Sequence, residues 1–262
     1  MTTKGTGGLI CRPWDPITKA TTQATKSALF LKYWKQRMIK LIYFKMRALA
    51  EAPQMLMRSS GVEYKYLMSW DHFGDQWTDV KATVPFKQLP ILELDNGTQI
   101  AQSIAILNYI EAIAGLTIPD PEKAAEASAV LQSSQELFAP LNPTVNFAVG
   151  EDFKAKRDAM RSDLESRFSD LERYLNKHDG KYFVDDTPRA AEFACFHHLD
   201  LSKKLDPKLL DGFPRLMKFV DDIQSIDEVS KYMEKRPELI DVGIEPKLVI
   251  DGTAHPTGVN RT

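Results

Sequence analysis

The sequence predicts a chain in two parts, an α/β half followed by an all-helical half. Two observations support this division. Short apolar runs typical of strands lie between residues 39 and 101, while amphipathic helical patterns fill the chain from about residue 122 to residue 236. A proline-containing stretch, residues 116–121, separates the two regions and marks a domain boundary. A length of 262 residues and a hydrophobic content of 43% suit one or two globular domains.

The first half opens with an apolar strand at residues 39–44, and a helical pattern follows at residues 48–60. Gly61 comes directly after this pattern, where a glycine suits the end of a helix. Residues 62–68 alternate between apolar and polar side chains and predict a second strand. We expect residues 70–83 to form an irregular loop.

A hairpin and a helix complete the first half. Residues 91–94 predict a strand, and the sequence Asp-Asn-Gly at 95–97 predicts a tight turn because Asn and Gly tolerate a positive φ. Residues 98–101 return as a strand, and Ser103 is expected to cap a helix at residues 104–114. The order β-α-β, loop, β-β-α is that of a thioredoxin-like domain.

The second half shows no strand pattern, and its helices are recognised from apolar stripes and from prolines. The clearest stripe is formed by five residues in one helix: Met160, Leu164, Phe168, Leu171 and Leu175. Pro188 suits the first turn of a helix, whereas Pro140 and Pro143 are expected to interrupt one. The predicted helices cover residues 122–138, 151–177, 188–203, 211–223 and 226–234.

Composition excludes several classes of function. The net charge is −2, so the chain as a whole has no charge suited to nucleic acid. Its two cysteines, Cys11 and Cys195, form neither a C-x-x-C motif nor a disulfide framework, which favours a reducing, cytoplasmic compartment. No apolar run approaches the ~18–20 residues that cross a bilayer, so we expect no transmembrane segment.

Both ends of the chain look like appendages. Residues 1–38 are basic and rich in threonine, and residues 1–40 contain eight basic residues against one acidic residue. This composition is typical of an organelle transit segment, but it also suits an arm that docks on a partner in a larger assembly, or a plain leader. Residues 237–262 are rich in Gly, Pro and Thr, with a short apolar piece at residues 248–250.

The stretch around Pro90 predicts a site for a peptide ligand. If the Leu89–Pro90 bond is cis, the chain turns there and Leu89 presents its backbone N–H and C=O groups outward. A ligand with a peptide backbone can then pair with Leu89 as a short added strand. Ser103 offers a hydroxyl and the N–H groups of a helix start, which attract a carboxylate. Together these features call for a small acidic peptide.

Two runs in this stretch carry a family resemblance. Residues 85–93 read Pro-Phe-Lys-Gln-Leu-Pro-Ile-Leu-Glu, and residues 102–110 read Gln-Ser-Ile-Ala-Ile-Leu-Asn-Tyr-Ile. Both are similar to the glutathione transferases, most closely to the sigma class, and the resemblance covers residues 39–236. It implies a thioredoxin-like glutathione-binding domain at 39–116, an all-α domain at 117–236, glutathione as co-substrate, no metal, and a homodimer.

The resemblance also implies a catalytic residue. Residues 40–47 resemble the start of sigma-class enzymes, in which the tyrosine at the position of Tyr43 activates the glutathione thiol. A free thiol has a pKa of about 8.5, and only the thiolate is a good nucleophile. A hydroxyl that donates to sulfur stabilises the thiolate. Beside Tyr43, the apolar Phe44 and Met46 are expected to line a pocket for a small hydrophobic electrophile.

Glutathione-binding roles follow for further residues. Trp77 and Lys81 would contact the glycyl end, where a cation pairs with the carboxylate. The other implied contacts are Gln88, Leu89, Gln102 and Ser103 in the same subunit and Glu136 reaching from the opposite subunit. Phe86 stands where related classes insert an aromatic knob into the partner; the alternative is a Phe in the core of its own chain.

Three departures from the family pattern weaken the catalytic expectation. Leu49 replaces an arginine near the thiol, where a cation would lower the thiol pKa, and Lys87 stands where glycine is common. Arg189 replaces the acidic residue of a helix cap, so Thr187 or Asp186 is expected to cap one step earlier. Two hypotheses remain: a glutathione transferase, acting by conjugation or isomerisation, or a non-catalytic structural subunit docked through its arms.

One further cluster attracts attention but predicts little. Cys195 and His198 share a face of a predicted helix, as two metal ligands would. Two ligands do not fix a metal, so packing in the core is the favoured interpretation.

Overall fold

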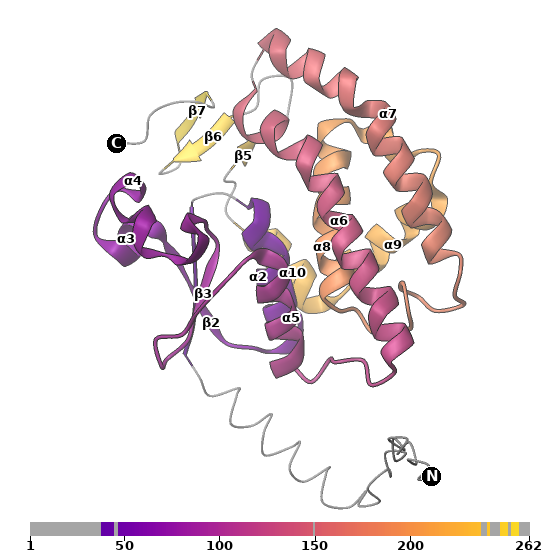
Figure 1. Ribbon diagram of the computed structural model, residues 1–262. Helices are drawn as coiled ribbons and strands as arrows, with labels where there is room; N and C mark the ends of the chain where they lie inside the picture. Colours follow the sequence, from indigo (N-terminus) through magenta and orange to yellow (C-terminus); the bar gives the residue numbers. More distant parts are fainter. Residues whose placement is uncertain are drawn as a thin grey trace, which may run out of the picture.

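The computed structural model describes residues 38–44, 47–148, 150–236, 240–241, 247–250 and 253–256 (Figure 1). The predicted N-terminal arm, apart from residue 38, lies outside these residues, as does Met46. Among the described residues, no helix combines the length and the apolar character needed to cross a membrane.

The N-terminal half is built on a four-stranded mixed sheet with the strand order β2-β1-β3-β4. Its strands are β1 (Ile39–Tyr43), β2 (Tyr64–Met68), β3 (Ile91–Glu93) and β4 (Gln99–Ala101). β1 pairs in parallel with β2, which places Tyr43 opposite Met68 at one end of the sheet. β1 pairs antiparallel with β3, and β3 with β4. This arrangement confirms the predicted thioredoxin-like order.

Helices α2 (Ala48–Ser60) and α5 (Ser103–Ile113) cover the side of the sheet that faces the helical half (Figure 1). α2 makes the crossover between the two parallel strands. The fully buried Met55 and Leu56 of α2 and Ile106 and Ile110 of α5 belong to the hydrophobic core. Gly61 ends α2 with a φ of 69°, the left-handed conformation that its position predicts.

The prediction of an irregular loop at residues 70–83 was wrong in detail. The structure places two short helices there, α3 (Ser69–Phe73) and α4 (Trp77–Val80), before two 3₁₀ turns. Each is about one turn long, so no apolar period could reveal them in the sequence.

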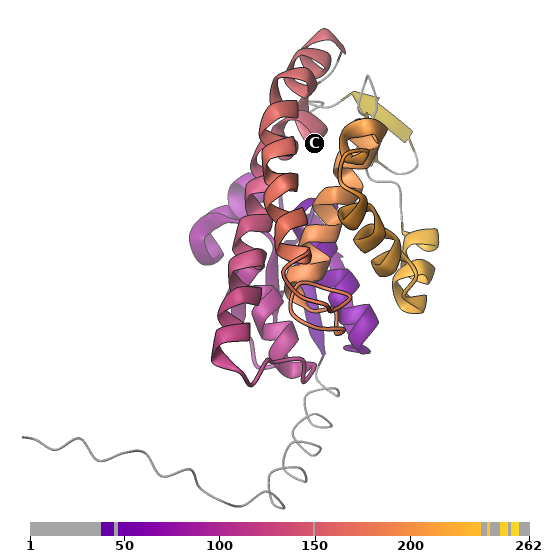
Figure 2. The same ribbon diagram turned by 90° about the vertical axis from the view of Figure 1, so that its right-hand side faces the viewer.

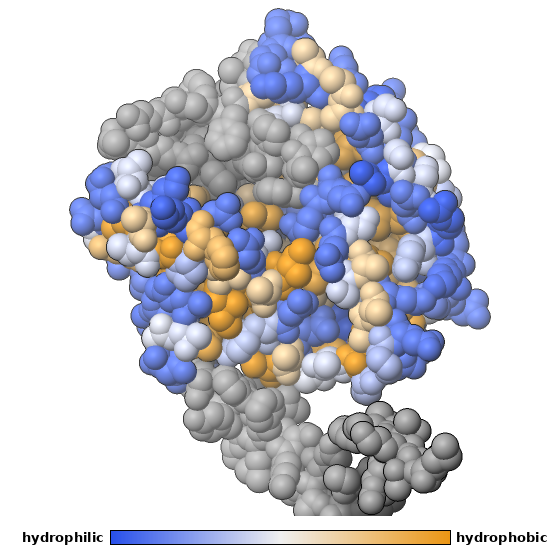
Figure 3. All heavy atoms as spheres, in the orientation of Figure 1, coloured by the Kyte–Doolittle hydropathy of each residue, from blue (hydrophilic) through white to orange (hydrophobic). Residues whose placement is uncertain are grey.

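Up to residue 236, the regular elements of the described C-terminal half are all helices, as predicted. Its helices are α6 (Pro121–Phe147), α7 (Gly150–Leu175), α8 (Ala190–Leu205), α9 (Pro214–Gln224) and α10 (Asp227–Lys235). α8 lies at the centre and packs against α2, α6 and α9 (Figure 2). Its side chains are buried over most of its length, including Phe193, Phe196 and Leu199. By contrast, the surface of α7 visible in Figure 3 is mainly hydrophilic.

The predicted break at Pro140 and Pro143 is absent, because α6 runs through both prolines to Phe147. Each proline removes one backbone donor from the helix. α6 makes its most extensive contact with α8, and such packing supplies most of the stability of a helix in a protein. Tertiary contact therefore outweighs the local cost of the two prolines.

A small antiparallel sheet follows α10. It consists of β5 (Ile240–Asp241), β6 (Lys247–Ile250) and β7 (Thr253–Pro256). β6 contains the apolar piece noted in the sequence. Figure 1 shows this sheet at the end of the molecule where α6 gives way to α7.

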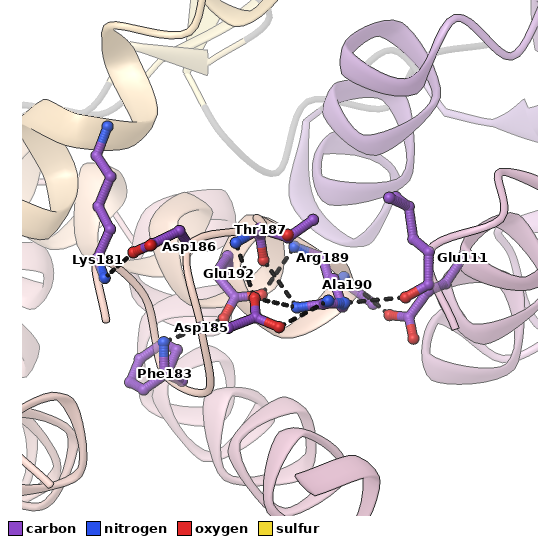
Figure 4. Close-up of polar contacts among 10 residues, drawn as sticks. Glu111, Lys181, Phe183, Asp185, Asp186, Thr187, Arg189, Ala190 and Glu192 are labelled. Atoms are coloured by element: carbon purple, nitrogen blue, oxygen red, sulfur yellow. Dashed lines mark hydrogen bonds and ion pairs between the residues drawn. The ribbon is translucent and has the colours of Figure 1, made fainter. Parts of the chain in front are cut away.

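The start of α8 ties the two halves together (Figure 4). The guanidinium of Arg189 makes a two-point ion pair with Asp185 at 2.7 and 2.9 Å, and its Nε donates to the backbone carbonyl of Leu116, in the linker, at 2.9 Å. Glu192 reaches back to accept the Arg189 N–H at 2.8 Å, which is half of a capping box. From α5, Glu111 accepts the Ala190 N–H at 3.2 Å.

The expected cap at Thr187 or Asp186 was therefore wrong, since α8 begins at Ala190 rather than at residue 188. The carboxylates that serve the first N–H groups come from Glu111 and Glu192. Arg189, which cannot accept a hydrogen bond, instead holds the linker.

Glu192→Gln is expected to change how stability depends on pH. Burial raises the pKa of Glu192 from 4.5 to about 7, although backbone N–H groups, among them those of Arg189 and Phe183, lower it. A carboxyl with a raised folded-state pKa binds its proton more tightly in the folded state, so stability falls as pH rises through this interval. As pH rises, the free energy of unfolding of the wild type should fall by up to about 1.4 kcal/mol per pH unit relative to that of the variant. Denaturant unfolding of both proteins at pH 5 and pH 8 measures this, and a difference independent of pH would contradict it.

Candidate active site

The end of β1 places Tyr43 and Phe44 in a row of aromatic side chains. The ring centroids of Tyr43 and Phe44 are 5.4 Å apart, and Phe44 meets Trp77 of α4 edge to face at 5.6 Å. Such contacts fix ring positions beyond what burial alone provides. The row brings together Tyr43, predicted to be catalytic, Phe44, predicted to line the electrophile pocket, and Trp77, predicted to contact the glycyl end of the ligand.

The phenol of Tyr43 is held in its neutral form. Tyr43 is only 5% exposed. Burial raises the pKa of its phenol to about 12, although a backbone hydrogen bond with Leu49 lowers it. A neutral phenol keeps its proton at any physiological pH and can donate a hydrogen bond. The site therefore contains a donor suited to stabilising a nearby anion.

The Leu89–Pro90 peptide bond is cis, the condition on which the peptide-pairing prediction depended. Leu89 itself is buried, and Gln88 is exposed beside it. The preceding residues Phe86 and Lys87 both have a positive φ, 55° and 54°. Glycine adopts this conformation without strain, whereas lysine does not, which gives a physical reason why glycine would suit position 87.

The start of α5 lies beside this bend. Gln102 occupies the residue before the helix, and its amide donates to the side-chain oxygen of Gln88 at 3.1 Å. Ser103 is the first residue of α5 rather than its cap, which corrects the prediction. At the start of α5, Ile106 is the first residue whose backbone N–H donates to an earlier carbonyl, that of Gln102. The N–H groups of Ser103 and the next two residues precede the regular helical bonding and suit an anion.

Lys81 and Glu136 occupy different surroundings. Lys81 is exposed just after α4, and the described residues include no carboxylate in ion-pair contact with it. Glu136 lies on α6 and makes an ion pair with Arg167 of α7 at 2.6 Å. Within one chain, therefore, Glu136 is engaged with a neighbouring helix.

Phe86 is 73% exposed, so the alternative of a Phe in the core of its own chain was wrong. Cys195 and His198 of α8, in contrast, are buried. Burial raises the pKa of the Cys195 thiol and lowers that of His198. The described part of the chain contains no group of three side chains placed to hold a metal.

Comparison with known families decides what this arrangement belongs to. The model of the glutathione S-transferase N-terminal domain matches residues 39–112, and that of the C-terminal domain matches residues 141–236. The chain belongs to the glutathione S-transferase family.

Relatives of known name agree with this assignment. The hematopoietic prostaglandin D synthase of Gallus gallus is 32% identical over 204 residues, which span 76% of this chain and 96% of the relative. Glutathione S-transferase 1 of Ascaris suum is 26% identical and covers 76% of this chain and 97% of its own. Among solved structures, NaGST-2 superposes with a TM-score of 0.69 at 27% identity, over 78% of this chain and 98% of that chain. At the level of the family, the chain is a glutathione transferase with glutathione as co-substrate.

Sequence reasoning missed a buried charge cluster at the junction of the two halves of this glutathione transferase. Arg236, which follows α10, donates to Glu51 of α2 at 2.6 Å and to Asp200 of α8 at 3.0 Å. The Tyr232 hydroxyl donates to the other oxygen of Glu51 at 2.7 Å. The available signal was Glu51 itself, an acid among the apolar residues of α2. Its partner Arg236 lies 185 residues later in the chain, so residue spacing could not predict the pair.

Proposed function

We propose that the chain catalyses attack by glutathione on a hydrophobic electrophile, with Tyr43 activating the thiol. The observation that carries this proposal is the neutral phenol at the end of β1. A phenol donates to a thiolate more strongly than to a thiol, and each pKa unit of this preference is worth about 1.4 kcal/mol. The Tyr43 hydroxyl therefore lowers the pKa of the bound thiol and raises the population of the nucleophile.

Glutathione would lie along the bend and the start of α5. The backbone of Leu89 pairs with the peptide, and Gln88, Gln102 and Ser103 hold its γ-glutamyl end. The cis bond at Pro90 and the contact between Gln88 and Gln102 support this placement. At the other end of the tripeptide, Trp77 packs against the ligand and the exposed Lys81 pairs with the glycyl carboxylate.

The second substrate is a small hydrophobic electrophile that lies against Phe44 and Met46. Glutathione-dependent isomerisation in the same site is a second candidate reaction. It is favoured by one observation, the 32% identity to a protein named prostaglandin D synthase. That relative also supports a position nearest the sigma class, and the two widely spaced cysteines support a cytoplasmic location.

The active unit is a homodimer in this proposal. Phe86 projects from a backbone of positive φ and is exposed in the single chain, as an anchor for a partner would be. Glu136 of one subunit then reaches the γ-glutamyl amine in the other. Figure 3 shows apolar surface gathered on the face where α5 and α6 meet.

Phe86→Ser is expected to shift the protein from dimer to monomer. Loss of a buried aromatic anchor costs about 2 kcal/mol or more of association free energy. The dissociation constant of the dimer should therefore rise about thirtyfold. Sedimentation velocity over a dilution series measures this shift. Met217→Ser is the matched control, because Met217 is an exposed hydrophobic residue on α9. An unchanged dimer in the Phe86 variant would contradict the role given to this residue.

The function is tested on the full chain by calorimetric titration with glutathione and by turnover of an activated chloro-dinitro-arene. Binding with turnover supports the enzyme. Binding without turnover of any electrophile would favour the alternative, a non-catalytic subunit docked through its terminal arms. No binding at all would overturn both the activity and the placement of the peptide.

A further inference from the structure

A row of polar side chains crosses the sheet on the face that α3 covers. The register places Lys40 of β1 opposite Lys65 of β2 and opposite Glu93 of β3. Glu93 in turn lies opposite Gln99 of β4. Residues that lie opposite each other in a sheet share a face, and Glu93 accepts from Lys40 Nζ at 2.8 Å and from Gln99 Nε2 at 3.1 Å. The carboxylate of Glu93 is therefore the acceptor on which this row converges.

α3 brings a histidine to the same carboxylate. The Nε2 atom of His72 lies 3.4 Å from Oε2 of Glu93, and both side chains are only 15% exposed. The imidazole meets the ring of Phe73 edge to face, with 4.7 Å between the ring centroids. Phe73 itself packs against the hydrophobic core. His72 thus makes a well-supported contact between α3 and β3.

The segment that His72 attaches carries the residues proposed for the glycyl end of glutathione. Trp77 begins α4, which packs against α3, and Lys81 follows α4. Figure 1 shows α3 and α4 on the opposite side of the sheet from α2 and α5. Each of the two helices is about one turn long, so tertiary contacts rather than its own hydrogen bonds must hold it in place. Trp77 provides one such contact, with Phe44, and His72 provides another.

The two partners in the contact between His72 and Glu93 respond differently to pH. Although burial raises it, the pKa of Glu93 is lowered by the hydrogen bonds from Lys40 and Gln99 and by the charge of His72. The carboxylate is therefore ionised near neutral pH. An imidazole, in contrast, ordinarily changes its charge between about pH 5 and 8. A cationic ring beside Glu93 adds a Coulombic attraction that a neutral ring lacks.

The other charged groups around His72 are carboxylates and ammonium groups, which ordinarily keep their charge between about pH 5 and 8. On the strands they are Lys40, Lys65 and Glu93, and on the segment itself they are Asp71, Asp75, Asp79 and Lys81. Among the described residues on this face, a change of pH in this interval therefore acts mainly on the imidazole.

We propose that the charge of His72 controls how firmly the α3–α4 segment is held on the sheet and, through it, the affinity for glutathione. In the cationic form, the pair with Glu93 holds α3 in place, and Trp77 and Lys81 lie where the glycyl end binds. In the neutral form, a smaller fraction of the molecules has the segment in place. Apparent affinity falls with this fraction, so glutathione should bind more weakly as pH rises. His72 is a positioning residue, and its effect on affinity rests on the glutathione site proposed above.

S-methylglutathione, which has no titrating thiol, is a suitable probe for calorimetry on the full chain at about pH 5.5 and pH 8. The wild type should bind it about threefold more tightly at the lower pH, as expected for a partly exposed ion pair. In His72→Gln, the affinities at the two pH values should be nearly equal. His178→Gln is the matched control, because His178 lies 2.9 Å from Glu126 in the helical half. This control should keep the pH dependence of the wild type.

Hydrogen exchange follows the segment without any ligand. At about pH 5.5, the amides of α3 and α4 should exchange about threefold more slowly in the wild type than in His72→Gln. They include the N–H of Gly74, which donates to the carbonyl of Trp70 at 2.9 Å. At about pH 8 the two proteins should exchange alike. Comparison at equal pH removes the intrinsic pH dependence of exchange, and the amide of Gly61 at the end of α2 is the internal reference.

The outcomes separate the inference from the proposed function. An affinity that does not change with pH in the wild type, or a change that His72→Gln preserves or His178→Gln equally abolishes, would overturn the control of affinity by His72. Equal exchange of the segment in the wild type and His72→Gln at the lower pH would overturn the positioning role itself. Absence of S-methylglutathione binding at both pH values would instead overturn the proposed function, and the exchange comparison would still decide whether His72 holds the segment.

Discussion

Tyr43→Phe is expected to lower kcat/KM for conjugation about a hundredfold while leaving glutathione affinity nearly unchanged. The variant keeps the ring and its packing against Phe44 but removes the only part of the side chain that can donate to sulfur. A loss of about two pKa units in thiol activation corresponds to about 2.7 kcal/mol. The effect falls on kcat because the hydrogen bond stabilises the thiolate rather than the bound tripeptide as a whole.

The pH profile separates this mechanism from a general loss of structure. The thiolate absorbs in the ultraviolet, so its titration can be followed on the enzyme. In the variant, the midpoint should move up toward the ordinary thiol value of about 8.5. Tyr43 itself, with a pKa of about 12, should not titrate in this interval. Tyr174→Phe on α7 is the matched control, and turnover that survives Tyr43→Phe intact would reject the mechanism.

Arg236→Leu is expected to destabilise the folded chain by about 3–5 kcal/mol. The side chain of Arg236 is 6% exposed and lies between two buried carboxylates, those of Glu51 and Asp200. Although burial lowers the pKa of Arg236, these carboxylates raise it, so the arginine is charged in the folded protein. Leucine removes the cation that Arg236 supplies to both of these buried carboxylates.

Urea unfolding of the wild type and the variant measures this loss. Arg157→Leu is the matched control, because Arg157 pairs with Asp158 at 2.9 Å on the surface of α7. A surface pair of this kind contributes about 0–1 kcal/mol. Equal effects of the two substitutions would show that the ion pairs of Arg236 do not stabilise the junction.

The sequence was most informative where local chemistry determines structure. The turn at residues 95–97 and the helix end at Gly61 each follow from the conformational preferences of one or two residues. Both are present in the structure. The bend at Pro90 was expected only on the condition of a cis peptide bond, and the Leu89–Pro90 bond is cis. The stripe on α7 likewise predicted a buried face, since Leu164, Phe168 and Leu171 are in the core.

Sequence reasoning failed where distant contacts decide the outcome. The continuation of α6 through Pro140 depends on α8, and the start of α8 depends on Glu111 of another helix. In the site, the contact between Gln88 and Gln102 requires two turns to meet. No single-sequence pattern contains such information, because these partners lie 14 to 79 residues apart.

α8 carries an attachment near each of its ends. Arg189, just before the helix, holds the carbonyl of Leu116, and Asp200, about 15 Å further along the axis, shares Arg236 with Glu51. Two separated attachments restrict the relative rotation of the two halves more than a single contact would. The two halves should therefore melt in a single cooperative transition, and neither should persist when expressed alone.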